Sequence, residues 1–294
     1  MDEIWVKKWA EIGCTRKGKT HMNQRKISVG LCGGKARAYV SFLLLGTVFA
    51  LAGCASNANS RLQSNDIVTD SDSTGVDRRA RIRYELAVGY FQQGKDTIAL
   101  DEVKQVLLLE PNSIDAWVLR GLIYLRLEQK ELAEQSFRRA QAIAPQNGAA
   151  ARNYAWLLCS QKRYTEADTQ FKRAVAANYE LARTYMSWGV CQREAGQKAA
   201  AEQTLRQSLE LEPLNPISGY NLAAILFEAQ QYEQARFYAR RVNNGEFSTA
   251  ASLWLGIRIE RVLNNVVAMQ QLASQLRSRF PDASELTALD KGAF

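Results

Sequence analysis

Histidine and cysteine have the most versatile side-chain chemistry, and both are scarce in this sequence. The 294 residues contain a single histidine, His21, and five cysteines. A catalytic triad with a histidine base and a metal site with histidine ligands both need an imidazole, but His21 lies in an N-terminal segment that we expect to be removed. No glycine-rich phosphate loop follows a strand pattern. The sequence therefore predicts a protein that is not an enzyme and has no cofactor or metal ion.

The acidic residues do not suggest acid–base catalysis either. Asp101, Glu102, Glu131 and Glu134 occur at helical spacing beside lysine and arginine residues. Charged residues in this arrangement usually cover a solvated helix face. We therefore expect these four carboxylates to be exposed and to have no catalytic role.

One cysteine has a context that predicts covalent chemistry. Cys54 ends the sequence Leu51-Ala52-Gly53-Cys54, directly after an apolar run from Tyr39 to Ala52 and a basic region before it. This layout is typical of a secretory signal, and the run is shorter than the about 20 apolar residues of a transmembrane helix. The four residues resemble a bacterial lipobox. The resemblance implies that the thiol of Cys54 receives a diacylglycerol, that the chain is cut before it, and that the new amine is acylated, for example with palmitate.

The lipobox interpretation divides the N-terminal part of the chain. Residues 1–53 are predicted to be a lipoprotein signal peptide, with Met22 as an alternative start, and an uncleaved anchor is the other reading of the same residues. Ala55 stands where an aspartate would retain a lipoprotein at the inner membrane, which favours the periplasmic face of the outer membrane. Residues 54–79 are polar, so we expect a flexible tether whose 25 or so residues reach about 25–30 Å.

The net charge of +8 does not indicate a nucleic-acid partner. Residues 1–53 carry nine Lys or Arg and three Asp or Glu, which gives +6, and the remainder carries 29 against 27, which gives +2. The basic excess therefore belongs to the segment that we expect to be removed, and no nucleic-acid binding is predicted for the mature protein.

Two further cysteines, Cys159 and Cys191, belong to the part of the chain that we expect to fold. Disulfides form in the compartment that a lipoprotein signal implies. The sequence does not show whether their Cα atoms come within bonding range. We interpret them as two small buried hydrophobic side chains.

The folded part of the chain repeats every 34 residues. A small residue recurs at Ala87, Gly121, Ala155, Gly189 and Ala223. A second one recurs at Ala99, Ala133, Ala167, Ala201 and Ala235, followed four residues later by a large apolar residue such as Phe137 or Phe171. Prolines close three units, whereas Tyr179 interrupts this series. The order of landmarks resembles the tetratricopeptide repeat, a pair of antiparallel helices in which Gly121 would face Ala133.

A single pair of helices cannot bury its apolar face, so the units are expected to stack. We predict an all-α fold for residues 80–294, a right-handed solenoid of about six tetratricopeptide repeats. The predicted units are 80–113, 114–147, 148–181, 182–215, 216–248 and 249–282. The last unit fits the landmarks if one residue is dropped, because Ala223 and Gly256 are 33 residues apart. A final capping helix is predicted over 283–289.

The first helices of such a solenoid line a concave groove. Large exposed apolar patches usually mark interaction sites, so we predict that a protein partner binds there, with a groove filled by the protein itself as the alternative. The absence of a suitable Asn and Lys/Arg pattern argues against a clamp for a C-terminal carboxylate. The predicted groove residues are Tyr84, Val88, Phe91, Val118, Leu122, Leu125, Trp156, Met186, Val190, Tyr220 and Phe227.

The combination of a lipobox, a polar tether, about six repeats and the ending Arg279-Phe280-Pro281-Asp282 resembles the type IV pilus biogenesis/stability lipoproteins of the PilF/PilW family. The resemblance implies a pilotin, which binds the secretin subunit and promotes its localisation and multimerisation in the outer membrane. It also implies attachment to the membrane through the lipid on Cys54 and a monomer when free. A lipidated scaffold for peptidoglycan enzymes and an accessory of outer-membrane protein insertion are the alternatives.

Overall fold

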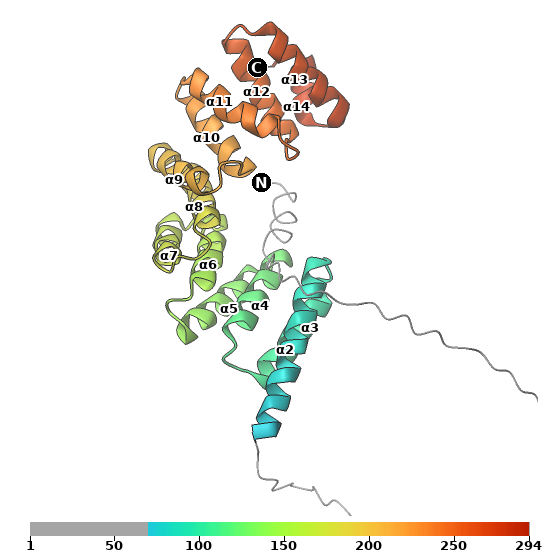
Figure 1. Cartoon of the computed structure of the whole chain (residues 1–294), viewed down its shortest axis with the longest axis vertical. Helices are drawn as coiled ribbons and strands as arrows, with labels where there is room; N and C mark the ends of the chain where they lie inside the picture. Colours follow the sequence, from blue (N-terminus) through green and yellow to red (C-terminus); the bar gives the residue numbers. More distant parts are fainter. Residues whose placement is uncertain (1–69, 294) are drawn as a thin grey trace, which may run out of the picture.

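Every regular element that the structure describes is an α-helix. The computed structural model describes residues 70–293, and it contains no strand within them (Figure 1). The predicted all-α fold is confirmed. The helices are α2 (Asp70–Gln92), α3 (Asp96–Leu109), α4 (Ile114–Arg126), α5 (Lys130–Ile143), α6 (Gly148–Ser160), α7 (Tyr164–Ala176), α8 (Leu181–Glu194), α9 (Lys198–Leu211), α10 (Pro216–Glu228), α11 (Tyr232–Asn243), α12 (Ala250–Val262), α13 (Val266–Arg279) and α14 (Ser284–Asp290).

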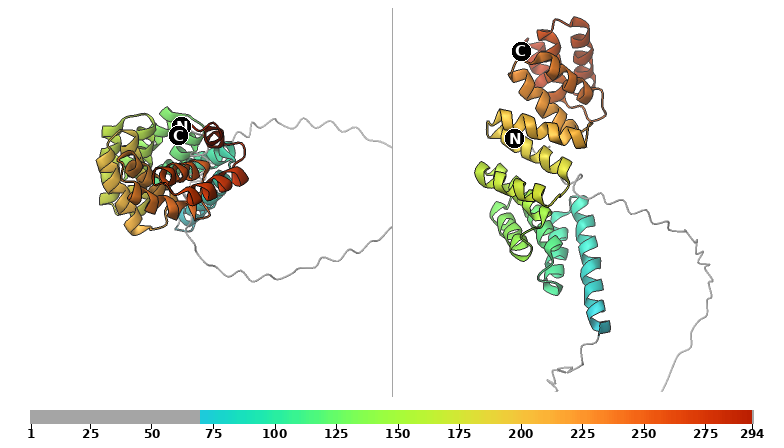
Figure 2. Two further views of the ribbon diagram at one scale, coloured as in Figure 1. Left: turned by 90° about the horizontal axis from the view of Figure 1, so that it is seen from above. Right: turned by 60° about the vertical axis from the view of Figure 1, so that its left-hand side comes forward.

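Helices α2 to α13 form six antiparallel pairs that stack along the long axis of the molecule (Figure 1). The second helix of each pair also packs against the first helix of the next pair. Seen from above, successive pairs are rotated about the long axis, so the stack winds as a solenoid (Figure 2). The predicted repeat architecture is thereby confirmed.

Close packing within a pair depends on a small residue in the first helix. A Cβ atom added to Gly121 of α4 would lie 2.7 Å from Cζ of Phe137 in α5. A Cβ atom added to Gly189 of α8 would lie 2.7 Å from Cγ of Leu205 in α9. The three heavy atoms nearest to a Cβ atom added at Gly121 all belong to the Phe137 ring. Glycine leaves room for the large side chain of the second helix, which fills the interface completely.

The turn inside each pair uses one residue with a positive φ angle at a constant position. A residue in this left-handed conformation ends a helix and lets the chain reverse. Most of these residues are not glycine, so the packing of the two helices holds the turn. The residues are Gly94, Glu128, Lys162, Gly196, Gln230 and Asn264, at a spacing of 34.

The sixth pair keeps the full repeat length, contrary to the prediction of a dropped residue. Helices α12 and α13 begin 34 residues after α10 and α11. Only the landmark is displaced: at this spacing Gly256 corresponds to Leu222, and Ile257 corresponds to Ala223. All four residues are buried. Because two adjacent positions of the first helix are buried, a small residue at either of them lets the two helices of the pair pack closely. The small residue of the sixth unit therefore lies one position earlier than in the other units, although the helices keep the 34-residue spacing.

The two ends of the solenoid differ from the middle. The predicted capping helix is confirmed as α14, where Leu286 and Leu289 pack against Leu253 and Ile257 of α12. At the other end α2 begins at Asp70, so the last part of the predicted tether is helical. Helix formation is cooperative, so the packed part of α2 favours continuation of the helix upstream to Asp70.

The N-terminal predictions fall largely outside the described residues. The signal peptide 1–53, the lipidation site Cys54 and the tether up to residue 69 all lie there. In the part of the chain that the structure describes, no helix has both the length and the apolar composition to cross a membrane.

Candidate protein-binding face

The predicted groove residues all lie on the first helices of the first five pairs, from α2 to α10. Nine of the eleven are half-buried. Val118 and Met186 are buried, with only 7% and 3% of their surface exposed. The expected continuous open stripe is therefore wrong at these two positions, because adjacent first helices pack closely and their side chains fill the space between them.

At the N-terminal end of the face the protein's own Arg126 covers Phe91. The guanidinium carbon of Arg126 in α4 lies 3.7 Å from the centroid of the Phe91 ring in α2. Arg126 also donates hydrogen bonds to the Asp96 carboxylate and to the carbonyl oxygen of Phe91. The side chains of Arg126 and Asp96 are only 12% and 15% exposed. This cluster ties α4 to the first pair, and Phe91 is not the open surface that the sequence suggested.

A disulfide crosses the middle of the face. Cys159 of α6 and Cys191 of α8 are bonded, with their Cα atoms 5.9 Å apart. Their separation of 32 residues is close to the repeat length, which places them side by side on neighbouring first helices. Both residues are buried in the apolar core, as predicted, and the disulfide answers the question of pairing that the sequence left open.

A pocket of about 270 Å³ opens at the C-terminal end of the face, between α8, α10, α12 and α14. Two predicted groove residues, Tyr220 and Phe227, meet there. Trp254 of α12 joins them, whereas the predicted groove residues came only from the first five units. Trp254 lies 34 residues after Tyr220, so an unbroken period would have identified it. The apolar wall consists of Tyr220, Ala224, Phe227, Ala251, Trp254 and Leu255.

Two of the charged side chains in the pocket are already neutralised. The Glu228 carboxylate lies 2.7 Å from Nζ of Lys198 and 3.7 Å from Nη2 of Arg193. The hydrogen bond from Lys198 is the main reason why the pKa of Glu228 lies below its ordinary value. Arg193 also donates a hydrogen bond of 2.8 Å to Oδ1 of Asn221. Arg193 and Glu228 therefore belong to a network that the protein completes itself.

The other two charged side chains of the pocket, Arg258 and Glu285, have no such network. The guanidinium carbon of Arg258 lies 4.7 Å from the centroid of the Phe227 ring. Arg258 forms no ion pair or hydrogen bond with any residue of the described part. Glu285 of α14 accepts a hydrogen bond of 3.1 Å from the Ser284 hydroxyl and has no ion-pair partner among residues 70–293. The pocket thus combines an aromatic wall with one uncompensated cation and one uncompensated anion.

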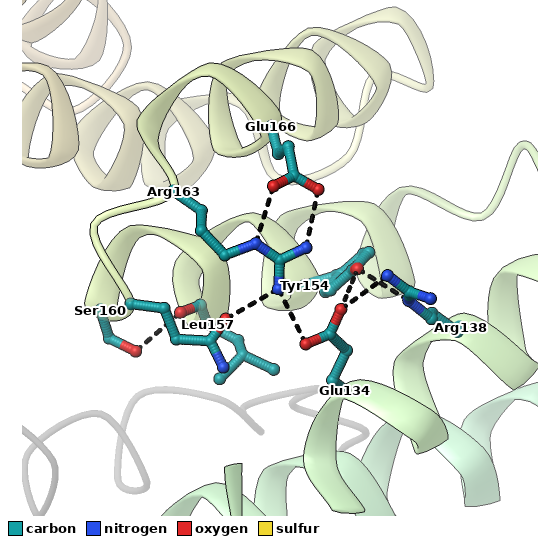
Figure 3. Close-up of polar contacts among 8 residues, drawn as sticks. Glu134, Arg138, Tyr154, Leu157, Ser160, Arg163 and Glu166 are labelled. Atoms are coloured by element: carbon teal, nitrogen blue, oxygen red, sulfur yellow. Dashed lines mark hydrogen bonds and ion pairs between the residues drawn. The ribbon is translucent and has the colours of Figure 1, made fainter. Parts of the chain in front are cut away.

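A second polar cluster lies between the second and third pairs (Figure 3). Glu134 of α5 accepts a hydrogen bond of 2.8 Å from the Tyr154 hydroxyl of α6. Its carboxylate also lies 2.9 Å from Nη1 of Arg163 and 2.8 Å from Nη2 of Arg138. Arg163 in turn donates two hydrogen bonds of 2.7 Å to the Glu166 carboxylate, as Figure 3 shows. The cluster connects α5, α6 and the start of α7.

The electrostatics of this cluster point to a structural role. Burial alone would raise the pKa of Glu134, but hydrogen bonds from Tyr154 and Arg163 and nearby positive charges outweigh it and lower the pKa. The hydrogen bond from Arg163 also lowers the pKa of Glu166. Both groups are therefore ionised and paired at neutral pH, which suits neither a general acid nor a free base. The Glu134 side chain is only 18% exposed, so the expectation that it is a solvated carboxylate is wrong.

The described residues offer no alternative site for metal chemistry. Between residues 70 and 293 no group of three or more His, Cys, Asp or Glu side chains could hold a metal ion. The C-terminal pocket of the concave face is therefore the feature with the clearest capacity for binding.

Comparison with known proteins shows the same fold and a relationship to pilus proteins. A family profile described as tetratricopeptide repeat matches residues 84–148. The chain is 27% identical over 254 residues to the type IV pilus assembly protein PilF of Pseudomonas aeruginosa, an alignment that covers 85% of this chain and 96% of that protein. Because the described residues make up less than 85% of the chain, this alignment extends into the sequence before α2.

Solved structures agree with this relationship. The structure of P. aeruginosa PilF matches with a TM-score of 0.68 and 26% identity, over 74% of this chain and 99% of that chain. The structure of PilW, a type IV pilus biogenesis factor, matches with a TM-score of 0.66 and 29% identity, over 71% of this chain and 97% of that chain. The predicted resemblance to these proteins is thereby confirmed. The chain has the helical-repeat fold of these proteins and is similar to PilF and PilW over most of its length.

Proposed function

We propose that this protein acts in type IV pilus biogenesis as an outer-membrane pilotin. In this role it binds the secretin subunit and promotes its localisation and multimerisation, and thereby supports pilus assembly and twitching motility. The observation that carries the proposal is the alignment with PilF, which spans 96% of that protein and includes residues on both sides of the start of α2. A shared repeat alone would match only the helical part.

The cysteines support export and anchoring. Cys54 follows an apolar run in a sequence that resembles a lipobox, and a lipid on its thiol and amine would hold the protein at the periplasmic face of the outer membrane. Several acyl chains together bind a membrane firmly, whereas one chain does so only marginally. The disulfide between Cys159 and Cys191 fits an oxidising compartment such as the periplasm.

The folded part would act as a binding scaffold and not as an enzyme. The polar cluster around Glu134 is internally neutralised, and the pocket beside Phe227 contains aromatic side chains with a few charges, which is the composition of a protein-recognition site. A monomer presents this concave face to the partner without competition from a second copy.

Deletion of the gene in its host, followed by complementation with the full-length chain, tests the proposal. Loss of twitching and of secretin multimers on a blot of outer-membrane fractions, both restored by complementation, is the expected result. Normal multimers combined with altered wall morphology would favour a scaffold for peptidoglycan enzymes. A broad loss of barrel proteins would favour a role in outer-membrane protein insertion.

A further inference from the structure

We propose that the pocket between α10, α12 and α14 binds an extended segment of the partner in which a large apolar side chain adjoins an acidic residue. The inference rests on the proposed function for the identity of the partner, the secretin subunit. The chemistry of the bound segment, however, is inferred from the pocket itself.

The aromatic residues of the pocket are the reason to expect a large apolar side chain in the bound segment. Tyr220 and Phe227 of α10 and Trp254 of α12 surround a space of about 270 Å³. This volume is near the lower end of the roughly 300–1,000 Å³ of small-ligand pockets, so it suits one large side chain with its flanking backbone. Aromatic residues clustered in a concave pocket are typical anchors of protein interfaces. Tyr220 and Phe227 are half-buried and thus remain partly open to solvent.

Arg258, which has no acceptor in the described part of the protein, is the reason to expect an acidic residue in the bound segment. Its guanidinium packs beside the Phe227 ring and has no acceptor within the described residues, whereas Arg193 in the same pocket is already bonded to Asn221 and close to Glu228. A planar guanidinium held at an aromatic ring presents its fork of donors to a carboxylate, with which it forms paired hydrogen bonds. We therefore expect an acidic residue of the bound segment to supply this acceptor.

Glu285 restricts where that acidic residue can lie. Its carboxylate comes from α14, the helix that closes the solenoid, and has no cationic partner among residues 70–293. It can accept a hydrogen bond from a backbone N–H of an extended guest, and it repels a second carboxylate. A negative charge on the guest is therefore favoured only beside Arg258. Such a segment would enter the part of the described face where partly exposed aromatic side chains adjoin two charged side chains that have no ion-pair partner among residues 70–293.

Fluorescence anisotropy with short synthetic peptides tests this chemistry. The probes are fluorescein-labelled, C-terminally amidated peptides with Gly-Ser flanks around Phe-Asp, Phe-Asn or Ala-Asp, titrated with the full-length protein in detergent. We expect Phe-Asp to bind at least about tenfold more tightly than either other peptide, which corresponds to about 1.4 kcal/mol. Equal affinity for Phe-Asp and Phe-Asn would overturn the proposal.

Variants of Arg258 separate recognition from folding. Arg258→Gln should lose the preference for Phe-Asp over Phe-Asn, whereas Arg173→Gln, an exposed change on α7, should keep it. Arg258→Glu should prefer a Phe-Lys peptide over Phe-Asp, a reversal that a merely structural role would not produce. A preference for Phe-Asp that persists in a folded Arg258→Gln protein, with its helical circular dichroism unchanged, would overturn the proposal.

Binding of the purified secretin by the same proteins separates this inference from the proposed function. Weaker secretin binding by Arg258→Gln supports the inference. Secretin binding that is unchanged in this variant leaves the proposed function standing and overturns the inference. Selective binding of Phe-Asp peptides by a wild-type protein that does not bind the secretin supports the pocket chemistry and contradicts the proposed partner.

Discussion

Cys159 and Cys191 are bonded across the junction of the third and fourth repeats, with their Cα atoms 5.9 Å apart. The same junction has an irregular linker, in which Asn178 and Glu180 both adopt positive φ angles around Tyr179. Tyr179 stands where other repeats have a proline. This linker still packs on α6, where the Arg152 guanidinium lies over the Tyr179 ring, and the disulfide adds a covalent tie between the first helices.

Removal of this disulfide should lower stability. The double variant with Cys159→Ala and Cys191→Ala opens a loop of 32 residues in sequence separation. Loop-closure entropy then predicts a loss of about 2–4 kcal/mol in the free energy of unfolding, measured by urea titration. Reduction of the wild-type protein should cause a similar loss, and the reductant should not affect the variant. Equal midpoints for oxidised and reduced wild-type protein would contradict this prediction.

Two glycines in first helices should respond in opposite ways to alanine. Gly121→Ala should destabilise the protein by about 1–3 kcal/mol, because its new Cβ atom would clash with the buried Phe137 ring. Gly89→Ala has open space around it and should be neutral or stabilise by up to about 1 kcal/mol through helix propensity. Thermal unfolding of both variants checks the pair. A similar effect at the two positions would show that the packing of α4 on α5 is described incorrectly.

The ionisation of Glu134 should make the free energy of unfolding depend on pH. Its pKa is lower in the folded protein than the ordinary value of 4.5 in the unfolded chain. The contribution of the ionised Glu134 to the free energy of unfolding is therefore complete above its unfolded pKa. It is lost as the pH falls through its pKa in the folded protein. Glu134→Gln should therefore cost about 1–2 kcal/mol at neutral pH and less in acid. Urea titrations between neutral pH and the acid limit of folding measure this, with the exposed Glu131→Gln as the control. A cost that does not change with pH would contradict the ionised state of Glu134.

Cys54→Ser should abolish lipidation. A serine hydroxyl cannot replace the thiolate that is alkylated, so the variant should accumulate as an unprocessed and mislocalised precursor. Labelling with a radioactive or clickable fatty acid, followed by cell fractionation, provides the measurement. The double variant with Cys159→Ala and Cys191→Ala, which keeps Cys54, should still be labelled and serves as the control. Fatty-acid label that persists in Cys54→Ser would disprove the anchoring site.

The sequence predicted the repeat architecture because its landmarks are packing residues with a fixed period. Gly121 approaches Phe137 in the second unit and Gly189 approaches Leu205 in the fourth, so the residue types and their spacing carry the fold. The capping helix α14 was equally predictable, because the end of a solenoid needs a cover.

The binding pocket was only partly predictable for a related reason. Tyr220 and Phe227 were found because they are apolar, whereas Arg258 was missed because a charged side chain does not stand out in a search for an apolar stripe. Trp254 was missed because the groove prediction stopped at the fifth unit and did not extend to the sixth. Likewise, nothing in the sequence indicates that Arg126 packs on Phe91, because that contact depends on how two pairs rotate relative to each other.

Affinity capture tests the central claim, that this protein binds the secretin subunit, most directly. The tagged full-length protein is purified from detergent-solubilised envelopes of its host, and bound proteins are identified by mass spectrometry against an untagged control. We predict that the secretin subunit of the type IV pilus is enriched with the tagged protein. Enrichment of peptidoglycan synthases, hydrolases or the barrel-insertion machinery, with the secretin at the level of the untagged control, would contradict the account.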